Sequence, residues 1–144
     1  LMDRTILAPA AVLVAWSLFM LLWLAISRFS AIAKAGIDMK NAPPGGRGQN
    51  LEGVLPDEVN WKSHNYAHLM EQPTLFYATV LILAVTGAVT PMLVKFAWAY
   101  VALRIIHSVY QSVRNVVMVR FSIFVLATVC LVVLAIHALL ATLQ

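Results

Sequence analysis

Two short segments of this sequence carry ionisable and amide side chains at spacings that fit one face of a helix. In the first segment, His64, His68 and Glu71 follow one another at intervals of four and three residues. The second segment has intervals of three, four and three residues, and its members are Arg104, His107, Gln111 and Arg114, with Tyr110 beside them. Because positions three, four or seven residues apart share a face of an α-helix, each segment predicts one polar stripe. Such side chains are suited to ion pairing, to binding a charged ligand or to metal coordination.

The elements that position these stripes are predicted to be transmembrane helices. Of the 144 residues, 62% are hydrophobic and only 11% are charged, whereas a soluble domain carries about a quarter charged residues. A spanning helix needs roughly 20 mostly apolar residues, and the apolar runs divide into four such segments. We expect an all-α membrane protein, a four-transmembrane-helix antiparallel bundle in which residues 1–144 form one domain. The expected helices are at about residues 6–27, 57–89, 92–117 and 121–143, and the expected loop is at residues 28–56.

Proline and glycine mark the breaks between these helices. The segment from Asn41 to Asn50 contains two prolines and three glycines, which predicts an exposed loop. Pro73 falls inside the second helix and is expected to bend it, because its ring displaces a carbonyl of the preceding turn. The first apolar run is longer than the core of a signal peptide, which is typically about 7–15 residues, so we expect it to remain as a helix.

The short connection between the second and third helices makes them an antiparallel hairpin, so their residues can be paired by depth. With the turn placed near residues 89–90, the expected pairs are Glu71 with Arg104, His68 with Gln111 and His64 with Arg114. An arginine near the middle of a bilayer costs roughly 2.5–3.5 kcal/mol on insertion scales unless it is paired or wetted. We therefore expect an ion pair between Glu71 and Arg104.

Such a pair has a structural interpretation beside the functional one. A buried Glu–Arg pair can do no more than hold two helices in register. The two stripes, however, contain at least seven polar groups that continue to one end of the helices, which is more than register requires. The pattern favours a cavity open to water.

The basic residues indicate a membrane orientation and argue against nucleic acid as a partner. The formal net charge is +4, but the lysines and arginines form no continuous basic face. Most of them lie in or beside two connections, and they are Arg28, Lys34, Lys40, Arg47, Lys62, Arg114 and Arg120. The opposite side has only Arg4 and Lys95. The positive-inside rule therefore predicts that both termini lie outside and that the two basic loops are cytoplasmic.

The four-helix plan, the segment from Trp61 to Tyr77 and the segment from Ala97 to Asn115 together resemble the MAPEG family, the membrane-associated proteins in eicosanoid and glutathione metabolism. The second segment is most similar to bacterial members, which implies a bacterial inner membrane. The resemblance implies a homotrimer that binds glutathione between neighbouring subunits near the cytoplasmic side. It also implies a transferase or peroxidase activity on a hydrophobic small molecule, which would enter from lipid between the first and fourth helices of adjacent subunits.

The family's motifs match this chain in part. The motif Arg-x-x-x-Asn-x-x-Glu falls on His64, His68 and Glu71, of which only the glutamate is kept. The motif Arg-x-x-Tyr falls on Arg104 and His107, where histidine replaces tyrosine. The arginine that activates the thiol in the family aligns near Met118, which is not basic. The nearest candidates for that catalytic role are Arg114 and Arg120.

The resemblance implies that glutathione is the co-substrate and that the residues of the two polar stripes bind it. A thiol with a pKa near 8.5 is mostly protonated at neutral pH, so the enzyme must stabilise the thiolate with positive charge. Arg104, His64 and Arg114 could hold the two carboxylates of glutathione, and Glu71 its amine. The expected glutathione-binding residues are His64, His68, Glu71, Arg104, His107, Tyr110 and Gln111.

Two other classes of protein fit the same residues. The first is a non-enzymatic membrane protein whose polar stripes serve assembly or binding of a partner. The second is a haem or metal protein, because His64, His68, His107 and His137 all fall on predicted helices. No cysteine or second carboxylate completes a metal-ligand set near His64 and His68, so no metal site is predicted.

Overall fold

The computed structural model of this chain describes residues 3–144 as four long α-helices and a connecting loop. The helices are α1 (Leu7–Ala35), α2 (Asp57–Thr86), α3 (Pro91–Val113) and α4 (Val117–Thr142), and the loop contains the short 3-10 helices η1 (Met39–Asn41) and η2 (Gly48–Leu51). Residues 3–144 contain no strand. All four α-helices are long and apolar enough to cross a membrane. The prediction of an all-α, four-helix integral membrane protein is confirmed.

The ends of the helices follow from residues that cannot continue them. α1 and α2 both end at a glycine in the left-handed conformation, Gly36 at φ 68° and Gly87 at φ 69°. At Gly87 the chain makes the paired backbone hydrogen bonds of a Schellman turn, from Gly87 to Ala84 and from Ala88 to Leu83. α3 then begins with Pro91, and the Thr90 hydroxyl accepts a hydrogen bond from the backbone N–H of Leu93.

Four helix boundaries lie away from the predicted ones, among them the end of α2, which is at Thr86 and not at about residue 89. α1 continues past Ser27 as far as Ala35, because nothing in this polar segment before Gly36 breaks a helix. α3 ends at Val113, and Asn115 takes a left-handed conformation with φ 55°. The break between α3 and α4 therefore precedes Arg120, which lies inside the first turns of α4 and does not mark the junction.

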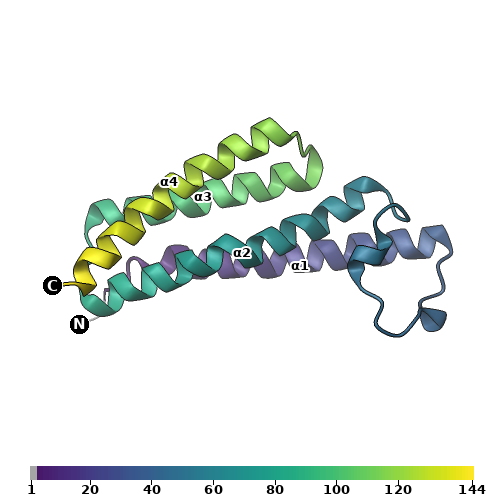
Figure 1. Cartoon of the computed structure of the whole chain (residues 1–144), viewed down its shortest axis with the longest axis horizontal. Helices are drawn as coiled ribbons and strands as arrows, with labels where there is room; N and C mark the ends of the chain where they lie inside the picture. Colours follow the sequence, from purple (N-terminus) through teal and green to yellow (C-terminus); the bar gives the residue numbers. More distant parts are fainter. Residues whose placement is uncertain (1–2) are drawn as a thin grey trace.

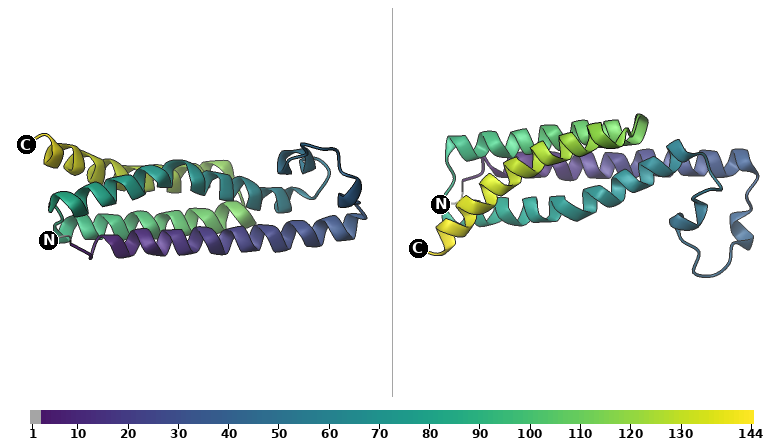
Figure 2. Two further views of the ribbon diagram at one scale, coloured as in Figure 1. Left: turned by 90° about the horizontal axis from the view of Figure 1, so that it is seen from below. Right: turned by 45° about the horizontal axis from the view of Figure 1, so that its top comes forward.

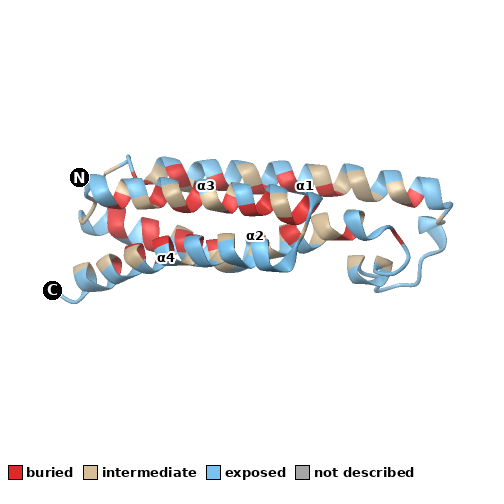
Figure 3. Ribbon diagram, turned by 90° about the horizontal axis from the view of Figure 1, so that it is seen from above, coloured by how far each residue is buried: buried red, intermediate tan, exposed pale blue. Residues whose placement is uncertain are grey.

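α2 and α3 form the centre of the bundle. α1 packs on α2 and α3 on one side, and α4 packs on α3 and α2 on the other. Figure 2 shows the four helices nearly parallel to one common axis, with both termini at the same end. The buried residues face this shared interior and the exposed ones face outward, as Figure 3 shows. Most of the outward residues are large and apolar, which fits a surface surrounded by lipid.

α1 and α2 project beyond α3 and α4 at the end where the loop lies (Figure 1). α1 has 29 residues, which corresponds to about 43 Å at 1.5 Å per residue. The hydrocarbon core of a bilayer is about 30 Å thick. The end of α1 and the start of α2 therefore reach into the polar interface of the membrane, together with the loop between them.

Pro73 lies inside α2 and is buried, and the helix continues through it to Thr86. Figure 1 shows α2 curving along its length, so that its first half rises away from α1. A proline removes one hydrogen bond of the helix, which permits such a curve.

A chain of side-chain hydrogen bonds joins the three helices near the middle of the bundle. The Tyr100 hydroxyl of α3 donates to the Gln72 amide oxygen of α2 over 2.9 Å. The Gln72 amide nitrogen donates to the Thr128 hydroxyl of α4, also over 2.9 Å. The Thr128 hydroxyl donates in turn to the carbonyl of Phe124 over 2.8 Å. The Tyr100 ring is fully buried and stacks on Phe76, with ring centroids 4.4 Å apart.

Removal of the Tyr100 hydroxyl tests this network. Tyr100→Phe leaves the Gln72 oxygen without its donor, and hydrogen bonds between membrane helices contribute about 0.6 kcal/mol on average and at most about 1.7 kcal/mol. We expect a lower free energy of unfolding by an amount in that range, measured by denaturant titration in detergent. Tyr66→Phe is the matched control, because the Tyr66 hydroxyl makes no hydrogen bond within the described chain. Equal stability of the two variants would contradict the network.

Candidate functional site

The centre of the candidate site is Arg104, which lies on α3 and is fully buried. Its Nη2 donates to the imidazole Nδ1 of His68 over 2.8 Å and to the backbone carbonyl of the same residue over 3.3 Å. A guanidinium has no acceptor, so the Nδ1 of His68 is the acceptor and carries no proton. Arg104 is therefore held by two neutral groups of α2.

Aromatic rings close over this pair of residues. The ring of His68 stacks on the ring of His107, with centroids 5.0 Å apart and an interplanar angle of 21°. Phe124 of α4 meets His68 edge-on at 5.2 Å. The guanidinium carbon of Arg104 lies 5.8 Å from the centroid of the Phe124 ring, within reach of a cation–π interaction. The sequence analysis did not identify Phe124, because a phenylalanine within an apolar helix gives no distinguishing signal.

The predicted ion pair between Glu71 and Arg104 is wrong. Glu71 is exposed, and Arg104 meets His68, one helical turn earlier on α2. His68 likewise contacts His107, one turn away from the Gln111 that was expected to face it. The register differs because the chain reverses direction near Gly87, directly after α2 ends at Thr86, and not near residues 89–90 as expected. The earlier turn changes which residues of α2 and α3 lie at the same depth. Within residues 3–144 the contact between an acidic and a basic side chain is a different one, between His64 and Glu52, and it is an ion pair when His64 is protonated.

Around Arg104, several buried polar atoms have no hydrogen-bond partner within the chain. On α3 they are Arg104 Nε and Nη1, His107 Nδ1, Ser108 Oγ, Gln111 Oε1 and Ser112 Oγ, and on α2 both amide atoms of Asn65. Buried polar atoms in folded proteins are nearly always paired, because an unpaired one costs about 1–3 kcal/mol. Ser108 and Ser112 can pair by rotating their hydroxyls onto a carbonyl of the preceding turn. Water, a ligand or a neighbouring subunit can supply partners for the other atoms.

The remaining predicted residues lie toward the end of the bundle that carries the loop. His64 Nε2 lies 2.7 Å from Glu52 Oε1, and both side chains are about half exposed, at 44% and 52%. Arg114 is exposed at the end of α3. Tyr110 is half-buried and Gln111 is buried. This end therefore presents His64 and Arg114 to the outside, while Gln111 stays inside.

Arg120 occupies a different environment from Arg114. It is half-buried, and its Nη1 donates to the side-chain oxygen of Asn115. His68 lies against Phe124 and Gln72 against Thr128, so α2 and α4 run side by side in a fixed register. One turn closer to their N-termini, the same register brings Arg120 level with His64.

Gln72 is the residue of the site region that the sequence could have revealed. It follows His64 and His68 at a further interval of four residues, so the three share one face of α2. Glu71, the predicted member, lies next to this face and is exposed. The intervals of four and three residues drew attention to Glu71, whereas a repeated interval of four residues leads to Gln72.

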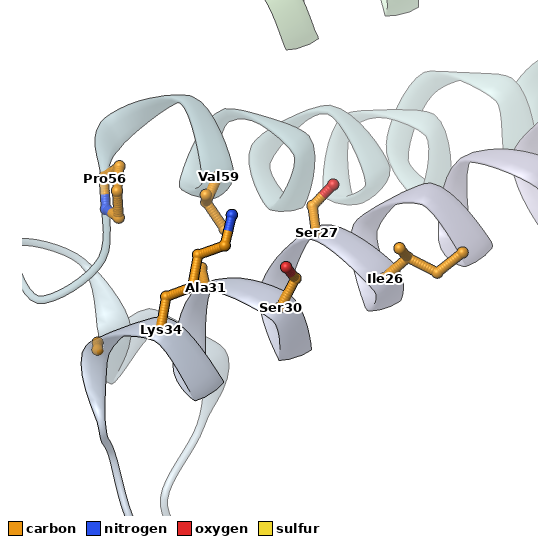
Figure 4. A pocket seen from close by; sticks show the side chains of 8 residues that line it. Ile26, Ser27, Ser30, Ala31, Lys34, Pro56 and Val59 are labelled. Carbon is orange, nitrogen blue, oxygen red and sulfur yellow. The ribbon is translucent and has the colours of Figure 1, made fainter.

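Three surface cavities lie apart from this cluster. The first, of about 550 Å³, lies between α1 and the start of α2 and is shown in Figure 4. The second, of about 770 Å³, lies under the loop beside Arg28, and the third, of about 350 Å³, lies on the surface of α1. Neither Arg104 nor His68 lines any of these three cavities. Across residues 3–144, His, Cys, Asp and Glu side chains form no group of three that could hold a metal ion.

Comparison with known proteins assigns a family to almost the whole chain. Residues 6–140 match the model of the MAPEG family. Searches among curated proteins and among solved structures find no significant match.

Chemical crosslinking tests the register of the hairpin. The lone cysteine, Cys130, is first replaced by serine. Cysteines introduced as His68→Cys and Arg104→Cys should then be joined by a short thiol-specific crosslinker within one chain, because these side chains are in contact. The pair Glu71→Cys and Arg104→Cys is the control and should react more slowly, since Glu71 faces outward. Preferential joining of the control pair, measured by peptide mass spectrometry, would restore the register expected from the sequence.

Proposed function

Because this chain belongs to the MAPEG family, we propose that it is a membrane-bound, glutathione-dependent transferase or peroxidase that acts on hydrophobic electrophiles. The observation that carries this proposal is the row of buried polar atoms without partners on α2 and α3, centred on Arg104. Membrane helices that only pack together also bury polar side chains, but they pair them by hydrogen bonds between helices, whereas these atoms have no hydrogen-bond partner within the chain. A water molecule, a polar ligand or a polar group of a neighbouring subunit at this row would supply the missing hydrogen bonds.

Glutathione requires donors for two carboxylates, an acceptor for its ammonium group and positive charge near its thiol. The chain has candidates for each requirement at the loop end of the bundle and near its middle. His64 and Arg114 are exposed and could donate to the carboxylates. Glu71 is exposed and has no ion-pair partner among the described residues, so it could accept the ammonium group. The residues present therefore fit the chemistry of the proposed co-substrate.

Arg120 is our choice for the residue that stabilises the thiolate. Glutathione supplies the nucleophilic sulfur, and each unit by which the thiol pKa falls requires about 1.4 kcal/mol of preferential stabilisation of the thiolate. The guanidinium of Arg120 is bonded to the neutral amide of Asn115, so its charge is not compensated by an acid. Its half-buried position also limits screening by water. Arg114 is fully at the surface and is the weaker candidate.

Arg104 has a different role in this proposal. It is fully buried and shares two hydrogen bonds with His68, so a ligand cannot displace it without a cost. Its charge is balanced by no carboxylate in direct contact, which leaves a positive potential on the neighbouring surface of α2 and α3. The Arg104 guanidinium thus gives this region a positive charge that favours an anionic co-substrate.

The assembly and orientation that we propose follow the family and the charges. We propose a homotrimer that places glutathione between neighbouring subunits. The exposed side of Glu71 would then face the adjacent subunit. The basic loop end is proposed to be cytoplasmic, with both termini outside and the chain in a bacterial inner membrane. The hydrophobic electrophile would enter from lipid between α1 and α4 of adjacent subunits.

A non-enzymatic role remains the alternative, and the hydrogen-bond network favours it specifically. The chain of bonds through Tyr100, Gln72 and Thr128 is complete, and it links three helices without any ligand. If the polar side chains serve only assembly, variants of Arg104 should change the oligomeric state and should leave the binding of small molecules unaffected.

Glutathione binding is the direct test. Calorimetry on the purified protein in detergent should detect binding, and Glu71→Ala should reduce the affinity at least tenfold, the factor that corresponds to about 1.4 kcal/mol for one lost ion pair. Glu58→Ala is the matched control, because Glu58 is exposed in the first turn of the same helix. If a folded sample of the unmodified protein binds no glutathione, the proposed function is wrong.

The role of Arg120 has a spectroscopic test. Addition of glutathione should produce the ultraviolet absorbance of a thiolate at neutral pH, and Arg120→Ala should abolish that signal while glutathione still binds. Arg47→Ala in the exposed loop is the control and should retain the signal. An unchanged thiolate signal in Arg120→Ala, together with its loss in Arg114→Ala, would transfer the role to Arg114.

A further inference from the structure

Two of the surface cavities are neighbours along α1 and are together called the groove. The cavity of about 550 Å³ and the cavity of about 350 Å³ share one lining residue, Ile26. The first extends from Ile26 toward the loop end of α1, where Pro56 and Val59 at the start of α2 form its other wall. The second extends from Ile26 toward the middle of the bundle, where Val109 of α3 lies opposite.

The residues that α1 contributes to this groove lie on one face. The lining positions at intervals of three and four residues are Trp16, Phe19, Trp23, Ile26, Ser30 and Lys34, which is the spacing of a single helical stripe. This stripe runs beside the buried one that includes Leu13, Ser17 and Met20. The groove is therefore a second face of α1, one that the rest of the chain leaves open.

The end of the groove near the loop is polar and positively charged. Figure 4 shows the side chains of Lys34, Ser30 and Ser27 directed from α1 into the space beneath the start of α2. No aspartate or glutamate lines either cavity. An ammonium group with two neighbouring hydroxyls can hold a phosphate by charge and by hydrogen bonds. This end also belongs to the part of α1 that projects into the membrane interface.

The other end of the groove is apolar and aromatic. Its walls are Trp16, Phe19, Leu22, Trp23 and Val109. A second cation lies beside this wall, because Lys62 Nζ sits 5.0 Å from the centroid of the Trp23 ring. Lys62 is held there by the carbonyls of Glu58 and Ser112, at 3.0 and 3.5 Å. Among the described residues that line the two cavities, Lys34 alone is charged, and it lies at the end nearest the interface.

We propose that this groove binds one anionic phospholipid, with its phosphate at Lys34, Ser30 and Ser27 and one acyl chain along Trp23, Leu22 and Phe19. The distance along α1 from Lys34 to Phe19 is about 22 Å at 1.5 Å per residue. One leaflet of a bilayer, with its headgroups, is about 20–22 Å thick. The groove therefore matches a lipid in length, in the order of polar and apolar ends, and in charge.

A second copy of this chain would fit the groove less well. A spanning helix packed along it would place apolar side chains against the ammonium of Lys34 and the hydroxyls of Ser27 and Ser30. A phospholipid satisfies both ends at once. The proposed site is formed within one chain, whereas the proposed entry route of the electrophile lies between adjacent subunits.

Native mass spectrometry tests the proposal on the full chain, released from detergent after incubation with phosphatidylglycerol or with zwitterionic phosphatidylcholine. We expect retention of one phosphatidylglycerol per chain, in preference to phosphatidylcholine. Lys34→Gln should weaken that retention about fivefold, since one lysine at an anionic headgroup is worth about 1 kcal/mol. Lys40→Gln is the matched control, because Lys40 is an exposed lysine of the loop that lies outside the groove.

A second variant tests the acyl end without changing any charge. Ile26→Trp places a large side chain where the two cavities meet and should abolish retention of either lipid, while circular dichroism shows the same helix content. Equal retention of both lipids, or equal effects of Lys34→Gln and Lys40→Gln, would overturn the proposal. The proposal would also be overturned if the unmodified protein retained no lipid and Ile26→Trp changed the oligomeric state. Another chain would then cover the groove. Glutathione takes no part in these measurements, so their outcome is independent of the proposed activity.

Discussion

The constraint on which this structure depends is the burial of the Arg104 guanidinium within a membrane bundle. An arginine at this depth must find hydrogen-bond acceptors inside the protein, because lipid offers none. His68 supplies two of them, its imidazole Nδ1 and its backbone carbonyl, and the Phe124 ring covers the cation from α4. One side chain thereby fixes the relative depth of α2, α3 and α4.

The partner of Arg104 is neutral, and this has consequences for chemistry. A carboxylate in contact would cancel the charge, whereas an imidazole acceptor leaves it in place within a medium of low dielectric constant. The surrounding polar atoms of His107, Ser108 and Gln111 have no partners in the chain, so the site combines positive charge with free hydrogen-bonding capacity. This combination is the basis of the proposal that an anionic ligand binds near these helices. The network of Gln72, Tyr100 and Thr128, one turn deeper, keeps the same three helices aligned.

The difference in helix length divides the molecule into two regions. Where all four helices run together, the interior is closed and the outer surface is apolar. Where α1 and α2 extend beyond α3 and α4, the loop, the exposed His64 and Glu52 pair and the polar end of the α1 groove gather at the membrane interface. Polar and charged side chains are therefore concentrated at one end of the molecule, where they can contact both water and lipid headgroups.

The sequence by itself determined the class of the protein and the position of its helices along the chain. Apolar runs of spanning length and glycine and proline at the breaks are local signals, and they predicted four helices correctly. The spacing of His68, Arg104 and His107 also identified residues that the fold brings together. The pairing across the hairpin was decided only by the tertiary structure, because the Schellman turn at Gly87 and the start of α3 at Pro91 shift the register by one turn. A shift of that size makes His68 the partner of Arg104 in place of Glu71. The helical periodicity of one segment cannot predict this shift, because it says nothing about the position of the other helix. The contribution of Phe124 and the groove along α1 were likewise beyond the sequence, since both arise where side chains of separate helices meet.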